Sequence, residues 1–467
     1  MGLRSPSSNQ RANDVNRARR RAGLELICGW AVASLVATRT LTGCGGGAAV
    51  KGDGGSPADS TLPAPPDSGG DGKLLYGGLT AKDIGWARMF GRSEASVPAV
   101  RWARHLSDGS FVFGGAVDKT LELFGPAPSA PSREVPGPKY VAKLDALGTL
   151  LWATTLGDAT DSAWLGATLL GDGSVAVLAR TQKPGDEIQI IPSSGGPLLS
   201  APLPLPCAAL AGGLDGTILA VGQYAPGDDL DPGPGVTTAT GPGGFVLVLS
   251  AATGVPRTIH LFPSATWVPP AGIARTTDGA VVVVGLPQTV PLHASLATLD
   301  LSNDSVVAHY DSTDPFQDWV LRADGRAAIA TFKSADPGVC VVVDVDVHTG
   351  TMLDRSESPG NTLADGLVDR QGQSVLWSNR SNRGNPEVGQ LRTLSATVSP
   401  GEWEWLLVLQ ALQSFDAVLV DPDGTVLFFG SVFLDAGQST LNAVWPAAIP
   451  YVASSTSRYY YVERIGP

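Results

Sequence analysis

Cysteine is scarce in this sequence, with only four among 467 residues. Cys28 and Cys44 fall within the first 44 residues, whereas Cys207 and Cys340 lie far apart and show no metal-ligand spacing. This pattern excludes a disulfide-rich scaffold. Cys207 and Cys340 are therefore either two buried free thiols or one disulfide between separate repeats.

Histidine and the common catalytic motifs are also scarce. The five histidines are scattered along the chain: His105, His260, His293, His309 and His348. No Gly-x-Ser-x-Gly elbow, Walker loop or sialidase Asp box occurs. The sequence therefore offers no candidate catalytic residues, and we expect a protein that is not an enzyme. A carboxylate pair at glycosidase separation cannot be recognised from sequence, so an enzyme stays the alternative.

Basic residues are outnumbered. The chain has 32 lysines and arginines against 44 acidic residues, a net charge of −12. Without the first 43 residues, 25 basic and 42 acidic residues remain. Such a surface repels nucleic acid phosphates and anionic lipid headgroups. We therefore expect no nucleic acid partner, and partners that are neutral, cationic or bridged by a divalent metal.

The first 43 residues resemble a bacterial lipoprotein signal peptide. Four arginines between positions 17 and 21 precede an apolar run at 24–36, which is too short to span a bilayer permanently. The sequence Leu-Thr-Gly-Cys then ends at Cys44, the expected lipid attachment site. This resemblance implies an outer-membrane lipoprotein facing the periplasm or the cell surface, held there by its lipid alone. Ordinary secretory cleavage and an uncleaved start are the alternatives.

Residues 44–78 are rich in Gly, Ser, Pro and Asp. They contain too few large apolar side chains to offset the entropy lost on ordering, so they are predicted to form a disordered tether. Such a tether reaches about 30 Å. The folded domain is then expected at residues 79–467.

The segment from residue 99 to 157 contains the pattern that the rest of the chain repeats. An apolar run, VRWARHL, is followed by an Asp-Gly turn and a second run, SFVFGGA; a long polar loop leads to YVAKLDALGTLLWATTLG. This pattern predicts four antiparallel strands with short, long and short connections. One such sheet cannot bury both of its apolar faces, so several copies must pack together.

Two interleaved series of turns give the number of four-stranded units. The first series is Asp108-Gly109, Asp172-Gly173, Asp215-Gly216, Asp278-Gly279, Asp324-Gly325, Gln371-Gly372 and Asp423-Gly424. The second series lies at 145–148, 193–195, 251–254, 302–304, 347–350, 399–401 and 465–466. Seven units of four strands, each about 50 residues long, are typical of a β-propeller.

The two ends of the domain complement each other. Residues 84–91 look like the fourth strand of a unit without its first three, and residues 458–466 look like a third strand without its fourth. We predict that residues 86–90 pair antiparallel with residues 459–464. The predicted fold is thus an all-β, seven-bladed propeller of four-stranded antiparallel blades, closed by pairing of its N-terminal and C-terminal strands.

Residues 111–157 and 218–254 resemble bacterial SBBP-type β-propeller repeats, in which a strand of the form FVAKLD-x-x-G-x-x-x-W follows a Gly-rich loop. The resemblance implies a propeller on an extracytoplasmic protein and no assigned chemistry. A weaker likeness, carried by LDALGTLLWA and VDVHTGTML, is to PQQ-type propeller repeats. These occur both in quinoprotein dehydrogenases and in an outer-membrane assembly lipoprotein.

Long, unequal connections are expected on one face of the propeller, at 117–138, 224–243, 258–270, 311–317 and 432–457. Because binding residues are usually displayed on such loops, this face is the predicted binding surface, with tolerated insertions as the alternative. Trp102, Trp164, Trp267 and Trp319 precede or begin the first strands of successive units. They are the candidate ligand-binding residues, and packing between blades is the alternative.

Two acidic groups could hold a metal. Asp228, Asp229 and Asp231 lie in a Gly-rich loop and could bind Ca²⁺, although acids also stabilise turns in such loops. Asp344, Asp346 and His348 alternate with valines on one strand face, where a solvated face is the alternative. No other cofactor is expected.

Together these observations predict a monomeric, non-enzymatic binding module on the bacterial cell envelope that binds a protein or a glycan through its loop-rich face. The alternatives from other classes are a propeller-type enzyme, either a PQQ-like oxidoreductase or a polysaccharide hydrolase or lyase, and a scaffold of envelope assembly.

Overall fold

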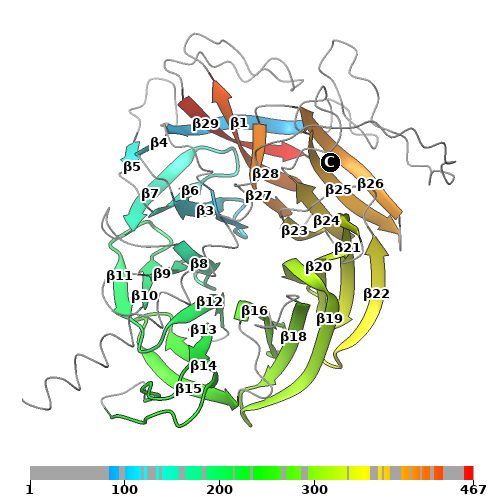
Figure 1. Ribbon diagram of the computed structural model, residues 1–467. Helices are drawn as coiled ribbons and strands as arrows, with labels where there is room; N and C mark the ends of the chain where they lie inside the picture. Colours follow the sequence, from blue (N-terminus) through cyan, green and yellow to red (C-terminus); the bar gives the residue numbers. More distant parts are fainter. Residues whose placement is uncertain are drawn as a thin grey trace, which may run out of the picture. The chain divides into compact units, whose positions relative to one another are not determined.

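The computed structural model describes residues 84–93, 100–116, 120–123, 133–135, 139–156, 164–180, 186–213, 216–231, 235–263, 270–285, 293–333, 336–357, 366–370, 373–378, 391–399, 402–410, 413–420, 425–434 and 457–465. All of them belong to one compact unit, Pro63–Pro467. Their regular elements are strands, and every strand pairing among them is antiparallel (Figure 1). The predicted all-β class is confirmed. The described residues contain no helix that is long and apolar enough to cross a membrane.

Four sheets contain four strands each, in consecutive order. Sheet 1 consists of β2 (Trp102–His105), β3 (Phe111–Ala116), β6 (Lys139–Leu144) and β7 (Leu150–Leu156). Sheet 2 consists of β8 (Trp164–Leu169), β9 (Val175–Arg180), β10 (Asp186–Ile191) and β11 (Leu199–Pro202). Sheet 3 consists of β12 (Cys207–Gly212), β13 (Thr217–Tyr224), β14 (Gly243–Ser250) and β15 (Pro256–Pro263). Sheet 5 consists of β23 (Gly366–Arg370), β24 (Gln373–Ser378), β25 (Leu391–Ser399) and β26 (Glu402–Gln410).

Sheet 4 has seven strands because one long strand serves two ladders. Its strands are β16 (Pro270–Arg275), β17 (Val281–Gly285), β18 (His293–Asp300), β19 (Ser305–Leu321), β20 (Arg326–Lys333), β21 (Asp336–Asp346) and β22 (Thr351–Glu357). The first part of β19 pairs with β18 and its last part pairs with β20. The prediction of a displayed loop at 311–317 is therefore wrong, because these residues continue the strand.

The terminal sheet joins the two ends of the domain. Its order is β27-β28-β29-β1-β4-β5. Its strands are β1 (Ile84–Ser93), β4 (Leu121–Leu123), β5 (Arg133–Val135), β27 (Gln413–Val420), β28 (Val426–Leu434) and β29 (Ser457–Ile465). The predicted pairing of the first strand with the last is present, with Ile84 opposite Ile465 and Arg92 opposite Tyr459.

The long loop of the first unit has a role that the sequence did not reveal. Part of it forms the hairpin β4–β5, which adds to the other edge of β1. Leu121 and Leu123 of this hairpin are fully buried. The described parts of the predicted loop 117–138, residues 120–123 and 133–135, thus belong to a sheet.

The predicted glycine turns have the expected backbone. Nine glycines of the two turn series have φ between +66° and +99°, a region that glycine enters without strain: Gly109, Gly148, Gly173, Gly195, Gly216, Gly254, Gly279, Gly325 and Gly350. At the corresponding position of the fourth unit, Asp304 has φ +49°. The turn chemistry read from the sequence is therefore confirmed wherever the structure describes it.

Some of these glycines also join one unit to the unit before it. A Cβ on Gly195 would lie 2.5 Å from Cγ of Trp152, which belongs to β7 of the preceding sheet. A Cβ on Gly350 would lie 2.2 Å from the carbonyl oxygen of His309. At the fourth unit, Asp304 replaces this close contact with an interaction of 2.7 Å between its carboxylate and Nδ1 of His260 on β15.

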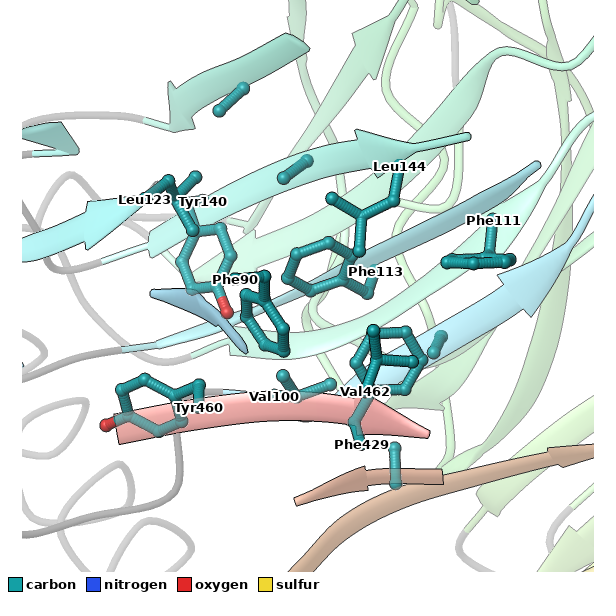
Figure 2. Close-up of a cluster of buried hydrophobic side chains, with 14 of the residues drawn as sticks. Phe90, Val100, Phe111, Phe113, Leu123, Tyr140, Leu144, Phe429, Tyr460 and Val462 are labelled. Carbon is teal, nitrogen blue, oxygen red and sulfur yellow. The ribbon is translucent and has the colours of Figure 1, made fainter. Parts of the chain in front are cut away.

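The largest aromatic core lies between sheet 1 and the terminal sheet (Figure 2). The rings of Phe90 and Phe113 are edge to face at 4.9 Å between centroids, and Phe429 lies 5.1 Å from Phe113. Tyr460 of β29 stacks on Phe90 at 6.2 Å. Such aromatic pairs add stability beyond the area that they bury. The cluster thus fastens both terminal strands to the first sheet.

Removing the ring of Phe90 tests whether the aromatic cluster holds the terminal strands to sheet 1. Because its ring is buried among three other aromatic rings, Phe90→Ala is expected to lower the free energy of unfolding by about 3–5 kcal/mol, measured by urea denaturation. Val307→Ala is the control, since Val307 is 57% exposed, and should change stability by no more than about 0.5 kcal/mol. Equal effects of the two substitutions would contradict the role assigned to the cluster.

Two glycine substitutions separate backbone strain from inter-sheet contact. Gly216→Ala meets no atom within 4 Å, so only its positive φ should matter, at about 1–2 kcal/mol. Gly195→Ala has a similar φ and must also displace Trp152, which should add about 1–3 kcal/mol. Thermal and urea unfolding of both variants measure the difference, and equal losses would show that the Trp152 contact relaxes without cost.

Candidate functional site

The structure places two of the four candidate tryptophans fully. Trp102 on β2 is 8% exposed and packs in a cluster with Val112, Trp152 and Val177. Trp319 on β19 is half-buried and packs beside a different cluster. The backbone of Trp164 begins β8, and Trp267 lies outside the described residues.

Trp102 and Trp319 do not share a surface. Counted from the tight turn, Trp102 occupies the fourth ladder pair of its sheet and Trp319 the third. Since side chains alternate along a strand, the two rings point to opposite faces of their sheets. Trp102 packs toward the following sheet, whereas Trp319 lies against Gly272 of β16, within the preceding ladder. Packing, the alternative that the sequence left open, accounts for both contacts.

The acidic loop is organised by its own backbone. Asp228 accepts a hydrogen bond from the backbone N–H of Ala225 at 2.8 Å. Asp229 accepts from the N–H groups of Asp231 and Thr237, at 3.0 and 2.9 Å. These contacts are those of a turn, and Ca²⁺ binding by Asp228, Asp229 and Asp231 stays a prediction. The part of the chain that the structure describes brings no three His, Cys, Asp or Glu side chains together in a metal-binding arrangement.

The side chains of the second acidic group, Asp344, Asp346 and His348, contact different partners. Asp344 forms an ion pair with Arg322 at 2.9 Å. Asp346 accepts the N–H of His348 in the next turn, at 2.8 Å. The imidazole of His348 lies 3.6 Å from Asp278 in the preceding ladder. The three side chains therefore act in separate contacts within and between units.

The two described cysteines are free and buried. Cys207 and Cys340 lie on β12 and β21, and burial together with the nearby Asp186 carboxylate raises the pKa of the Cys207 thiol well above its ordinary value. The first of the two interpretations drawn from sequence, a pair of free thiols, is confirmed.

The structure brings together two charged residues that the sequence analysis did not single out. Arg104 on β2 and Asp318 on β19 belong to the first strands of non-adjacent units, yet their charges lie close enough to interact. The only sequence signal was a charged residue between apolar residues near the start of a first strand, in RWARHL and PFQDWVL. That signal could not indicate which two strands would meet.

Each charge of this pair is held by backbone contacts. Asp318 accepts the N–H of Leu367 on β23 at 2.7 Å and that of Trp319 at 2.8 Å. The guanidinium of Arg104 donates to the carbonyl oxygen of Ala103 at 2.9 Å and lies 5.8 Å from the centre of the Trp102 ring. Trp102 and Arg104 share one face of β2, two residues apart.

Both groups are crowded by protein. Desolvation raises the pKa of the Asp318 carboxyl to about 6, against the opposing effect of its N–H donors and of Arg104. Desolvation by neighbouring groups also lowers the pKa of Arg104, which is nevertheless exposed to solvent. A carboxyl with this pKa can donate or accept a proton near neutral pH.

Two polar atoms close in sequence to this pair lack partners among the described residues. They are Nε1 of Trp102 and Oε1 of Gln317, and both are buried. A buried donor or acceptor without a partner lowers the stability of the fold by about 1–3 kcal/mol, and a hydrogen bond from another group would remove this penalty. Arg104 on β2 and Asp318 on β19 are together what we call the inner-strand site.

Comparisons with known proteins show structural similarity at low sequence identity. No family model matches the sequence, and no curated protein matches it. Among solved structures, the chain is similar to Kuenenia stuttgartiensis hydrazine synthase at 12% identity and a TM-score of 0.45, over 72% of this chain and 94% of that one. It is also similar to the Dos1 propeller at 8% identity and a TM-score of 0.44, over 82% of this chain and 96% of that one. The resemblance to SBBP-type repeats stays a prediction.

The raised pKa of Asp318 predicts a specific pH dependence of stability. Between about pH 4 and pH 6 the folded chain keeps a proton that the unfolded chain has lost, so stability falls as the pH rises through this window. Asp318→Asn removes the charge and keeps an oxygen acceptor for Leu367. Urea unfolding should show the variant more stable than the parent near pH 7, by up to about 3 kcal/mol, and equal to it near pH 4.

Asp108→Asn is the matched control with the opposite sign. The hydroxyl and N–H of Ser110 lower the pKa of Asp108 to about 2, so its contribution is present at neutral pH and is lost as the pH falls below about 4. This variant should be less stable than the parent near pH 7. A loss of stability in Asp318→Asn near pH 7 would contradict the desolvation of that carboxyl.

Proposed function

We propose that this chain is a non-enzymatic, extracytoplasmic binding module whose domain is a seven-bladed β-propeller, and that it holds a protein or glycan at the loop-rich face and the adjoining inner strands. The observation that carries the proposal is the inner-strand site, where the charges of Arg104 and Asp318 from separate sheets interact and Arg104 is exposed to solvent. In an apolar scaffold such groups are characteristic of binding sites.

The contacts between first strands support the seven-bladed ring. β2 contacts both β8 and β27, and further contacts join β8 to β12, β12 to β16, β19 to β23 and β23 to β27. The remaining step, from β16 to β19, is made by Gly272 and Trp319. In this interpretation sheet 4 holds two blades that share β19, and the terminal sheet is the seventh blade.

Side-chain oxygens strengthen the same contacts. Thr168 of β8 accepts the N–H of Gly212 on β12 at 2.9 Å, as Asp318 accepts that of Leu367 on β23. Arg322, which is 6% exposed, joins Asp344 of sheet 4 to Asp369 and Ser374 of sheet 5. These links favour a rigid scaffold on which loops can vary, as in other propellers.

Location outside the cytoplasm belongs to the same proposal. It rests on the leader and on Cys44, which lie outside the described residues, and on the acidic surface. A lipid on Cys44 would make the membrane a point of attachment only, and the binding partner would be met by the folded domain.

A binding screen tests the function. The full chain carrying Cys44→Ser, immobilised on a sensor surface, is exposed to solubilised bacterial envelope proteins and to a panel of glycans. We expect saturable binding of at least one component. A paired variant replaces residues 231–236 with two glycines, which leaves the buried Leu230 and Ala239 in place.

The outcomes test the proposed binding surface and the proposed binding function separately. Weaker binding by the loop variant supports the loop-rich face, because that loop presents Val236 with 77% exposure. Undiminished binding rejects this loop as part of the surface. Turnover of any glycan in the panel, or no saturable binding at all, rejects a non-enzymatic binding module.

A further inference from the structure

The last strands of several units share a β-bulge close to their tight turns. In the ladders of β7, β15, β19 and β22 the pairing passes over one residue: Leu151, Arg257, Val307 and Leu353, respectively. All four residues are exposed. A bulge leaves its extra residue unpaired and can re-aim that side chain. Each of these units thus displays one side chain on the last strand of its ladder, and three of the four are aliphatic.

β22 is the most exposed of these four strands. It is the last strand of sheet 4, and among the described strands it pairs with β21 alone (Figure 1). Residues 351–355 are all exposed, so both faces of β22 meet solvent there. Met352 and Leu353 are 50% and 51% exposed. Methionine is enriched at protein interfaces, and its flexible side chain adapts to different partners.

The charges on β22 are mainly negative. Asp354 and Glu357 accompany a single arginine, Arg355. Carboxylates already surround the guanidinium of Arg355, which lies 3.3 Å from Glu357 and 3.7 Å from Asp314 of β19. Asp354 forms no ion pair with the part of the chain that the structure describes. Its carboxylate is therefore open to a cationic group from another molecule.

The neighbouring strand β19 adds a second carboxylate. Two contacts align the strands: Gly350 approaches the carbonyl oxygen of His309, and Arg355 lies beside Asp314. Asp311 falls between these contacts on β19, as the two exposed apolar residues do on β22. The side chain of Asp311 is 63% exposed, and the imidazole 3.5 Å from it carries a charge only when protonated. The apolar residues are thus flanked by acidic groups from two strands.

These charges limit which partner can cover the surface. A second copy of the chain would bring the same acidic groups and a net charge of −12. Anionic lipid headgroups would be repelled for the same reason. A protein segment that carries both basic and apolar side chains would neutralise the carboxylates and remove the apolar side chains from water.

We propose that Met352, Leu353, Asp354 and Asp311 form a docking surface, the β22 surface, for a partner protein segment in which apolar side chains alternate with lysine or arginine. The apolar side chains of the segment cover Met352 and Leu353, and its basic groups lie next to Asp354 and Asp311. This contact is an addition to the proposed function and does not depend on it.

Titration calorimetry of the full chain carrying Cys44→Ser tests the β22 surface with three octapeptides. In the first peptide lysine alternates with leucine, in the second glutamate replaces lysine, and in the third serine replaces leucine. Saturable binding of the first peptide is expected. Met352→Ser combined with Leu353→Ser should weaken it roughly tenfold or more, because the apolar contact is lost. Asp354→Asn should weaken it about two- to fivefold, since an exposed ion pair contributes less.

Val255→Ser is the matched control. Val255 is exposed to a similar degree, but the bulged residue of its strand is Arg257, which would repel a basic segment. This variant should bind the first peptide as the parent does. Circular dichroism and urea unfolding of every variant check that a loss of affinity occurs in a folded chain.

Several results would overturn the assignment. They are equal binding of the glutamate or the serine peptide, binding of no peptide, and unchanged affinity in the Met352→Ser, Leu353→Ser double variant. Self-association of the parent that this double variant abolishes, measured by sedimentation, would make the surface an interface between copies. Binding of the parent, and not of the double variant, to phosphatidylcholine vesicles would make it a lipid contact. Either result would replace the proposed protein partner.

Discussion

The joining of the two ends of the domain depends on the position of one strand, β1. β1 lies between β29, from the other end of the chain, and the hairpin β4–β5. Phe90 of β1 extends into the aromatic core beside Phe113, Phe429 and Tyr460. Backbone hydrogen bonds to β29 run along one edge of β1, those to β4 hold residues 91–93 of its other edge, and buried rings hold one face. Sheet 1 and the terminal sheet are joined through this strand.

The units are joined by small, repeated contacts. Positive-φ glycines allow one unit to approach the last strand of the unit before it, as with Gly195 and Trp152 or Gly350 and His309. First strands add hydrogen bonds from side chains, as with Thr168 and Asp318. Gly195 and Gly350 therefore each serve both a tight turn and a contact between units.

The sequence predicted the local structure well and the long-range contacts in part. Alternating apolar runs and Asp-Gly turns identify strands and hairpins because side-chain period and φ are local properties. The pairing of residues 86–90 with 459–464 followed from counting strands. The hairpin β4–β5 was missed because three-residue strands give no periodic signal. Arg104 and Asp318 could not be paired from sequence, since their interaction depends on how non-adjacent sheets are arranged.

The tryptophans were a weaker guide to a binding surface, because the position of each in its ladder decides the face to which its ring points.

The hairpin β4–β5 has a consequence for the order in which the chain can fold. β29 is made last, so the ladder between β1 and β29 cannot form until almost the whole domain has been synthesised, and such distant pairings are slow. β4 lies close to β1 in the chain and can pair with it early, at a small loop-closure cost. β1 would then already be paired with β4 when β29 is synthesised, and its other edge would be oriented for pairing with β29.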